Sequence, residues 1–212
     1  MASPSGKSKK EQILDAALEL FVTKGFQEAT IEDILAATGI ARGTLYYHFH
    51  SKTDIMMQII DRTAGEIAHQ AQLVANEVID FPMKFLRVVQ AAQVSGPARS
   101  LVSDMHEAPN AEFHIQSVTK TVEKLAPILG DVIAEGVTAG SCSSPQPLRD
   151  AEILLTAGFI LPDHGFFPAS VELSSARLMG LFVAAERLLQ LSSGTLTAFL
   201  VKDDHVATNS HR

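Results

Sequence analysis

The residues best suited to chemistry in this chain lie close together, immediately after Ile40. They offer hydrogen-bond donors, flat rings and, at one position, no side chain at all: Arg42, Gly43, Thr44, Tyr46, Tyr47 and His48. An arginine can donate two parallel hydrogen bonds to a guanine edge, and a glycine lets the backbone approach another molecule closely. Hydroxyl groups and rings can reach phosphates or a thymine methyl group. This combination is typical of a surface that contacts DNA.

A short helix is predicted immediately before this stretch. Thr30 and Asp33 have the spacing of a capping box, in which a hydroxyl and a carboxylate satisfy free amides of the first turn. The helix should therefore begin at Ile31, and Gly39 should end it in the left-handed conformation that glycine adopts without strain. The chain must then turn sharply.

A second helix should begin near Ala41 or Arg42 and carry the polar side chains on its outer face. Leu45 and Phe49 are spaced by four residues and form its inward pair. Two short helices joined by a glycine-bearing turn describe a helix-turn-helix, whose second helix lies in the DNA major groove. The same shape occurs in proteins that never bind DNA, so an ordinary solvated helical turn stays an alternative.

These residues resemble the signature of TetR-type (TetR/AcrR) transcriptional regulators. The resemblance is carried by Thr30, Ile31, Ile34, Gly39, Ile40, Gly43, Thr44, Leu45, Tyr46, His48, Phe49, Ser51 and Lys52. It covers roughly residues 1–52, and the rest of the chain is similar only in length and helical character. The resemblance implies an all-α dimer with a three-helix head that binds an operator and a larger C-terminal body that binds an effector.

The resemblance also implies which residues contact DNA. Bases would be read by Arg42, Gly43 and Tyr46, and the phosphate backbone would be held by Thr30, Thr44, Tyr47, His48 and Lys52. One position departs from the pattern, because Ala41 stands where the family usually has a Ser or Thr cap. Ala41 remains in the predicted interface, but the helix should lose about 1 kcal/mol of end stabilisation and one phosphate contact is in doubt.

The composition indicates an ordinary globular protein, with 46% hydrophobic and 19% charged residues among 212. The single cysteine, Cys142, cannot form an intramolecular disulfide and is typical of a reducing cytoplasm. No signal peptide and no apolar run of about 18 residues is found, so we expect neither export nor a membrane. The net charge of −7 lies wholly beyond residue 52, because the first 52 residues hold six basic and six acidic side chains. A neutral head predicts weak non-specific DNA binding and a modest salt dependence.

The predicted domains follow from this pattern. Residues 1–7 form a disordered basic arm, 8–52 the helix-turn-helix domain, 53–200 the effector-binding and dimerisation domain, and 201–212 a disordered tail. Ser8 and Glu11 form a further capping box that opens the first head helix. Helices are expected over residues 52–77, 82–105, 111–139, 148–160 and 171–191, with a weak point at 95–97 and a bend near Pro127.

Rows of small residues on the last two helices predict a surface for close helix packing. They are Ala176, Gly180 and Ala184 on the last helix and Ala151, Leu155 and Gly158 on the preceding one. Small side chains let another helix approach closely, so we expect a two-fold four-helix interface between subunits. Packing within one subunit is the alternative.

An effector site is implied by the resemblance, with no motif of its own in the sequence. Its predicted residues are Phe85, Val89, Met105, His106, Phe113, His114 and Val118. Polar groups cluster nearby at Asp104, His106, Glu107 and His114, either to orient a ligand or as solvated residues of a turn. We expect a small apolar or amphipathic molecule, no cofactor and no metal, because His106 and His114 lack a regular metal-ligand spacing.

The predicted function is that of a DNA-binding regulator, a repressor released from a palindromic operator by its effector. The first alternative is an all-helical enzyme or small-molecule-binding protein that has kept a helix-turn-helix without using it for DNA. Against an enzyme, Cys142 lies in a serine-rich loop without a motif, and no phosphate loop, acid pair or His-acid set is recognisable. The second alternative is a helical adaptor that does not bind DNA.

Overall fold

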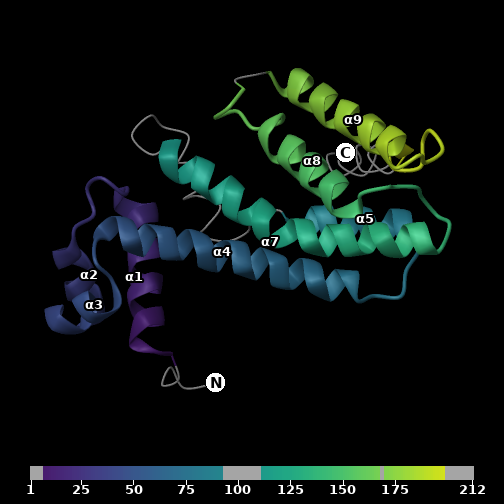
Figure 1. Ribbon diagram of the computed structural model, residues 1–212. Coiled ribbons are helices and arrows are strands. Elements are labelled where there is room, and N and C mark those ends of the chain that lie inside the picture. Colours follow the sequence, from purple (N-terminus) through teal and green to yellow (C-terminus); the bar gives the residue numbers. More distant parts are fainter. Residues whose placement is uncertain (1–6, 93–110, 168–169, 199–212) are drawn as a thin grey trace, which may run out of the picture. The chain divides into compact units, whose positions relative to one another are not determined.

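The computed structural model describes residues 7–92, 111–167 and 170–198, and within these ranges every regular element is helical. The helices are α1 (Lys9–Lys24), α2 (Ile31–Thr38), α3 (Arg42–His48), α4 (Lys52–Ala75), α5 (Phe81–Ala91), α7 (Ala111–Thr138), α8 (Pro147–Ile160) and α9 (Val171–Leu188) (Figure 1). The predicted all-α class is confirmed. The expected weak point at 95–97 lies outside the described residues, while α7 continues through Pro127 without interruption.

The chain divides into two compact units. The first, the head, comprises residues 1–65 and 94–120, and the second, the body, comprises residues 66–93 and 121–212. The expected boundary after Lys52 lies inside the head, because Ile55, Met56 and Ile59 of α4 are buried in the head core. Two helices, α4 and α7, therefore each contribute one end to the head and the other end to the body.

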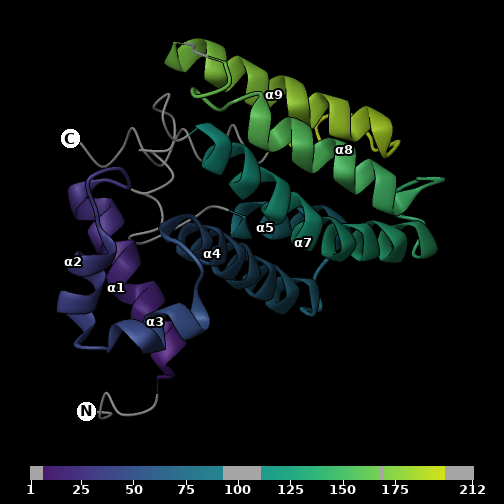
Figure 2. The ribbon, with the colours of Figure 1, turned by 60° about the vertical axis from the view of Figure 1, so that its left-hand side comes forward.

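The head core is formed by the inner faces of α1, α2 and α3 together with the first turns of α4. Figure 2 shows the three short helices gathered together, and α1 contacts both α2 and α3. Fully buried side chains from each element meet there, among them Ile13, Phe21, Ile34, Leu45, Phe49 and Ile55. Burying a side chain of this size contributes roughly 1.5–3 kcal/mol, so these contacts hold helices that are too short to be stable alone.

Capping residues place the helix ends where the sequence predicts them. Ser8 forms a complete capping box with Glu11 at the start of α1, and Thr30 forms one with Asp33 at the start of α2. Gly39 ends α2 with φ 66° and ψ 12°, which is the left-handed conformation. These local signals fix where the chain turns before α3.

The body has a core of its own, built from α5, the second part of α7, α8 and α9. Its buried residues include Phe85, Leu86, Leu125, Leu129, Ile133, Leu154, Phe182 and Leu189. The neighbouring helices α8 and α9 contact each other along their length (Figure 1). Gly136 of α7 allows close packing, because a Cβ atom there would lie 2.5 Å from the Phe81 ring. Among the described helices, none combines the length and apolarity that crossing a membrane requires.

The capping box of α2 makes the stability of the head dependent on pH. The Lys24 ammonium, 2.6 Å from Asp33 Oδ2, and hydrogen bonds from Thr30 lower the pKa of Asp33 from 3.8 to about 2. A depressed carboxyl pKa stabilises the fold above the unfolded pKa, and this stabilisation is lost as the pH falls from about 4 towards 2. Asp33→Asn should therefore lower the free energy of unfolding at pH 7, with a difference from wild type that narrows below pH 4.

Urea unfolding of both proteins at a series of pH values measures this difference. Glu19→Gln, at an exposed position of α1, serves as the control for removing one negative charge from the head. A difference between wild type and Asp33→Asn that stays constant down to pH 2 would show that the Asp33 charge does not stabilise the head.

Candidate nucleic-acid interface

Helix α3 turns one face into the head core and the other towards solvent. Leu45 and Phe49 have no exposed surface, and Ile40 in the preceding turn is 8% exposed. On the opposite face Arg42 and Gly43 are exposed, with Tyr46 at 45% and Tyr47 at 84%. The predicted anchors are therefore buried and the predicted contact residues of this face are presented outward.

The first turn of α3 has no side chain to cap it. Ala41 occupies the N-cap position, and its carbonyl accepts from the amides of Thr44 at 2.9 Å and Leu45 at 3.2 Å. Because alanine offers no side-chain oxygen, the first amides of the helix lack the cap bond that Ser or Thr would provide. Helix α3 thus depends on its buried anchors more than on its own ends.

Arg42 is held by a carboxylate of the preceding helix, which the sequence analysis did not assign to the site. Its Nη2 donates to Glu32 Oε1 at 2.5 Å, and both side chains are more than half exposed. The hydrogen bond between them raises the pKa of Arg42 and lowers the pKa of Glu32. Since Glu32 lies ten residues before Arg42 on another helix, no local spacing could have indicated the pair.

Gly43 has no packing reason to be a glycine. A Cβ atom built on it would meet nothing within 4 Å, apart from its own helix backbone and chain neighbours, and its φ is not in the left-handed region. Glycine costs a helix roughly 0.5–1 kcal/mol relative to alanine, so an intramolecular role would favour alanine here. The open space above Gly43 is therefore available for close approach by another molecule.

The aromatic residues after Gly43 lie in series. Tyr47 packs edge-on against His48 with ring centroids 5.0 Å apart, and His48 lies 6.2 Å from the Phe49 ring. His48 and Thr44 are half-buried, whereas Tyr46 and Tyr47 are exposed. The hydroxyl groups of both tyrosines are thus carried on the outer face of the helix.

Thr30 serves the fold in this structure. Its hydroxyl donates to Asp33 Oδ2 at 2.8 Å and accepts from the Asp33 amide at 3.1 Å. The residue is exposed, so its position at the first turn of α2 remains open to solvent. A phosphate contact from the hydroxyl would replace its bond to Asp33.

Lys52 differs most from the sequence prediction. Its Nζ donates to the carbonyl oxygens of Phe26 at 2.7 Å, Gln27 at 3.0 Å and Ala29 at 2.8 Å, which occupy all three ammonium hydrogens. The group also lies 4.6 Å from the Phe26 ring centroid, and burial lowers the pKa of Lys52. Lys52 thus links the start of α4 to the chain before α2.

Phe26 connects this link to α7. Its ring packs edge-on against Phe21 of α1 at 5.2 Å and against Phe113 of α7 at 4.7 Å. Phe113 therefore belongs to the head core. The sequence had instead predicted it to be a residue of the effector site. Contacts between residues so distant in sequence are a tertiary property, and no spacing in the chain predicts them.

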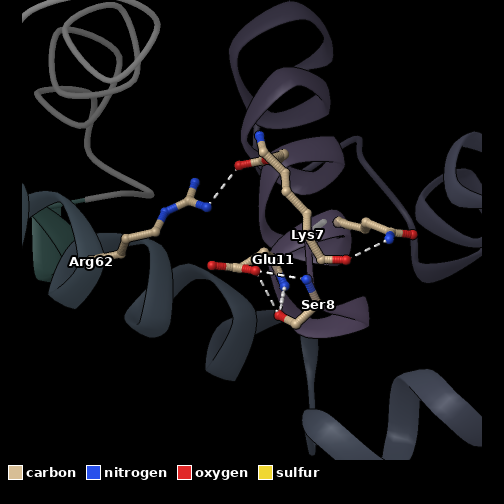
Figure 3. Close-up of polar contacts among 6 residues, drawn as sticks. Lys7, Ser8, Glu11 and Arg62 are labelled. Carbon is tan, nitrogen blue, oxygen red and sulfur yellow. Dashed lines mark hydrogen bonds and ion pairs between the residues drawn. The ribbon is translucent and has the colours of Figure 1, made fainter. Parts of the chain in front are cut away.

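The start of α1 is joined to α4 by charges. Asp15 receives hydrogen bonds from Lys7 Nζ at 2.6 Å and Arg62 Nη1 at 2.7 Å, and in Figure 3 the Arg62 side chain extends towards α1. Burial raises the pKa of Asp15, but the bonds from Lys7 and Arg62 outweigh it and hold the pKa below its usual value. Lys7, assigned to the basic arm, is thus paired, and residues 1–6 lie outside the described residues.

The predicted effector residues fall into different parts of the chain. Two of them lie on α5 in the body, where Phe85 is buried and Val89 is half-buried. The other described ones lie on the part of α7 that belongs to the head, and they are Phe113, His114 and Val118. Outside the described residues are Asp104, Met105, His106 and Glu107. Among the described residues, no group of three His, Cys, Asp or Glu side chains is arranged to hold a metal ion.

The predicted dimer residues divide by helix. Ala151 and Leu155 of α8 are buried within the subunit, and a Cβ atom on Gly158 would lie 3.2 Å from Leu181 of α9. These three residues of α8 are thus packed inside the chain, and their part in a subunit interface stays a prediction. The α9 row is different, because Ala176, Gly180 and Ala184 are exposed and no atom lies within 4 Å of a Cβ on Gly180, leaving aside its own helix backbone.

The fold and the site together define a helical protein with an N-terminal helix-turn-helix head. Residues 13–59 match the family described as bacterial regulatory proteins, tetR family. This part of the head is thus similar to the helix-turn-helix domain of TetR-family regulators, and the sequence match is concentrated there.

Individual relatives show this similarity as well. The HTH-type transcriptional repressor KstR2 of Rhodococcus jostii is 42% identical over 57 residues, which are 26% of this chain and 28% of the relative. The fatty acid metabolism regulator protein of Bacillus subtilis is 21% identical over 152 residues, 70% of this chain and 78% of the relative. For two further relatives, the regulators TtgW and SrpR of Pseudomonas putida, the matched segment spans only 40% and 24% of the relative's length.

Solved structures extend the likeness to the whole fold. The crystal structure of a TetR/AcrR-family transcriptional regulator from Thermobifida fusca has a TM-score of 0.59 and 18% identity, covering 84% of this chain and 97% of the other. At this identity the likeness concerns the fold. The body, like the head, therefore has the helical architecture of these solved structures.

The position of Lys52 predicts a structural effect for its removal. Lys52→Met should lower the free energy of unfolding by about 1–3 kcal/mol, because three carbonyls lose a charged donor. Urea denaturation measures this loss, and Lys10→Met, at an exposed position of α1, should change the free energy by less than about 0.5 kcal/mol.

The salt dependence of DNA binding distinguishes this effect from a phosphate contact. If Lys52 contacts a phosphate, its removal should reduce the slope of log K against log salt concentration by about 0.9. If Lys52 only stabilises the fold, its removal should leave the slope unchanged. A reduced slope in folded Lys52→Met would return Lys52 to the phosphate-binding set.

Proposed function

We propose that the protein is a DNA-binding transcriptional repressor that binds a palindromic operator as a dimer and is released by a small apolar or amphipathic effector. The observation that carries this proposal is the outward face of α3. It presents Arg42, Gly43 and Tyr46 above the buried anchors Leu45 and Phe49. A face with these donors, held at a fixed orientation, is suited to the major groove.

Each residue of the face has a distinct part in the proposed complex. Arg42 exchanges Glu32 for the O6 and N7 atoms of a guanine, a contact that discriminates by about 1–3 kcal/mol. Gly43 lets the first turn of α3 approach the bases, and Tyr46 contacts a base or a thymine methyl group. Tyr47 and His48 lie towards the sugar-phosphate backbone, where contacts fix the register of the helix.

Dimerisation is required because one small head rarely reaches specific affinity on its own. The exposed surface of α9 supports a second copy as the partner: Leu173, Ala176, Gly180, Ala184 and Leu188 follow one another at helical spacing. Ile153 of α8 is 58% exposed, and Leu161, which caps the end of α8, is 37% exposed. We therefore propose that the subunit interface uses this outer face of α8 and the small-residue row of α9.

Release of the operator is proposed to be a shift between two conformations of the body. An effector that binds one of them more tightly changes the position of α4, and hence the spacing of the two heads. The effector class is supported by one relative, which is named for fatty acid metabolism. Equal operator affinity with and without a molecule that binds the body would contradict this coupling.

A gel-shift assay on the promoter regions of neighbouring genes tests the DNA-binding face. Arg42→Ala and Tyr46→Ala should each weaken binding, by about five- to hundredfold for the arginine, since it supplies a bidentate contact. Gly43→Ala should weaken binding while raising the free energy of unfolding by up to about 1 kcal/mol. This opposite effect on binding and stability separates a DNA contact from damage to the fold.

The control for this assay is Gln72→Ala, at an exposed position of α4 in the body. It should leave binding unchanged. Retardation that is unaffected by both Arg42→Ala and Tyr46→Ala would reject the assignment of α3 as the DNA-binding surface.

Analytical ultracentrifugation tests the proposed dimer. Wild type should sediment as a dimer at micromolar concentration, and Gly180→Arg as a monomer, because an unpaired charge in the interface costs about 3 kcal/mol or more. The subunit itself has space for the new side chain, so its fold should persist. Ala134→Arg, on an exposed position of α7, should remain dimeric, and a monomeric wild type would contradict the proposal.

A further inference from the structure

A carboxylate lies against the arginine at the centre of the proposed DNA-binding surface. Glu32 Oε1 and Arg42 Nη2 are 2.5 Å apart, with 64% and 57% of the two side chains exposed. Both side chains are therefore accessible on the same surface, and DNA that contacts Arg42 also comes close to the Glu32 carboxylate. A negative charge in this place opposes the phosphate backbone, so its presence calls for a physical explanation.

Three cations in and near α3 have partners within the head. Arg42 is the only residue of α3, histidine aside, with a full positive charge at neutral pH, and Glu32 neutralises it. Lys24 is paired with Asp33 at 2.6 Å, and the Lys52 ammonium is bonded to backbone carbonyls. These three cations thus have partners within the head, which weakens their attraction to phosphate.

We propose that Glu32 is a specificity-determining residue. Its ion pair with Arg42 disfavours a contact between Arg42 and a phosphate more than a contact between Arg42 and a guanine edge. This inference rests on the proposed function. An exposed ion pair is weak, so two acceptors in the planar arrangement of guanine can replace the carboxylate. A phosphate can also accept two hydrogen bonds from an arginine, but it is negatively charged and Glu32 repels it, whereas the guanine edge is neutral. Glu32 lowers non-specific affinity more than operator affinity.

The test measures two affinities of the full-length protein by fluorescence anisotropy. One probe is a duplex enriched from a random-sequence library by repeated selection on wild type, and the other is poly(dI-dC). Glu32→Gln should tighten binding to poly(dI-dC) about three- to tenfold at low salt and tighten binding to the selected duplex less. The ratio of the two affinities should therefore fall about threefold or more.

Two variants separate the proposed effect from a general change of charge or shape. Glu19→Gln removes the same charge from an exposed position of α1 and should leave the ratio unchanged. Glu32→Asp keeps the charge and should keep the weak binding to poly(dI-dC). Far-ultraviolet circular dichroism shows whether each variant retains its helices.

The possible results have distinct meanings. If Glu32→Gln leaves the ratio unchanged, or if Glu19→Gln lowers it equally, the inference is overturned while the proposed function stands. Weaker binding of Glu32→Gln to the selected duplex alone would mean that Glu32 contacts DNA directly, which also overturns it. Failure of wild type to enrich any duplex would overturn the proposed function and this inference together.

Discussion

The burial of Leu45 and Phe49 beneath α3 is the constraint on which the proposed site depends. Helix α3 has seven residues and no side-chain cap bond, and a helix so short is not stable in isolation. Both anchors are fully buried, which fixes the rotation of α3 about its axis. Once that rotation is fixed, the outward position of Arg42, Gly43 and Tyr46 follows from helical geometry.

A second set of contacts holds the two long helices to the head. At the start of α4, the Lys52 ammonium donates hydrogen bonds to the carbonyls of Phe26, Gln27 and Ala29. Near the start of α7, Phe113 packs on the Phe26 ring. Because α4 and α7 both continue into the body, the head core contains the ends of two elements that an effector-induced change could move. The proposed coupling can therefore pass through either of two helices, α4 and α7, that begin in the head and end in the body, or through both.

Charge and apolar surface are divided between the two units in a way that suits the proposed function. Around α3, Arg42 and Lys24 are paired with Glu32 and Asp33, and the Lys52 ammonium donates to backbone carbonyls. The proposed complex therefore depends on base contacts and on the pairing of two heads more than on attraction to phosphates. In the body the exposed row on α9 consists of small and apolar side chains. In the proposed function, a weakly attractive head and a dimeric body together would favour binding at paired sites over binding along any DNA.

The sequence by itself determined the all-α class, the helix ends in the head, the anchors of α3 and its exposed face, whereas α5 ends at Ala91 and not at the predicted residue 105. These features depend on capping boxes, on Gly39 and on apolar residues at helical spacing, all of which act within one or two turns. Only the tertiary structure decided the partners of Lys52, Arg42 and Phe113, and which small residues of α8 and α9 face inward. Such contacts join residues from different helices, and their free energy depends on how those helices pack, which no local spacing encodes.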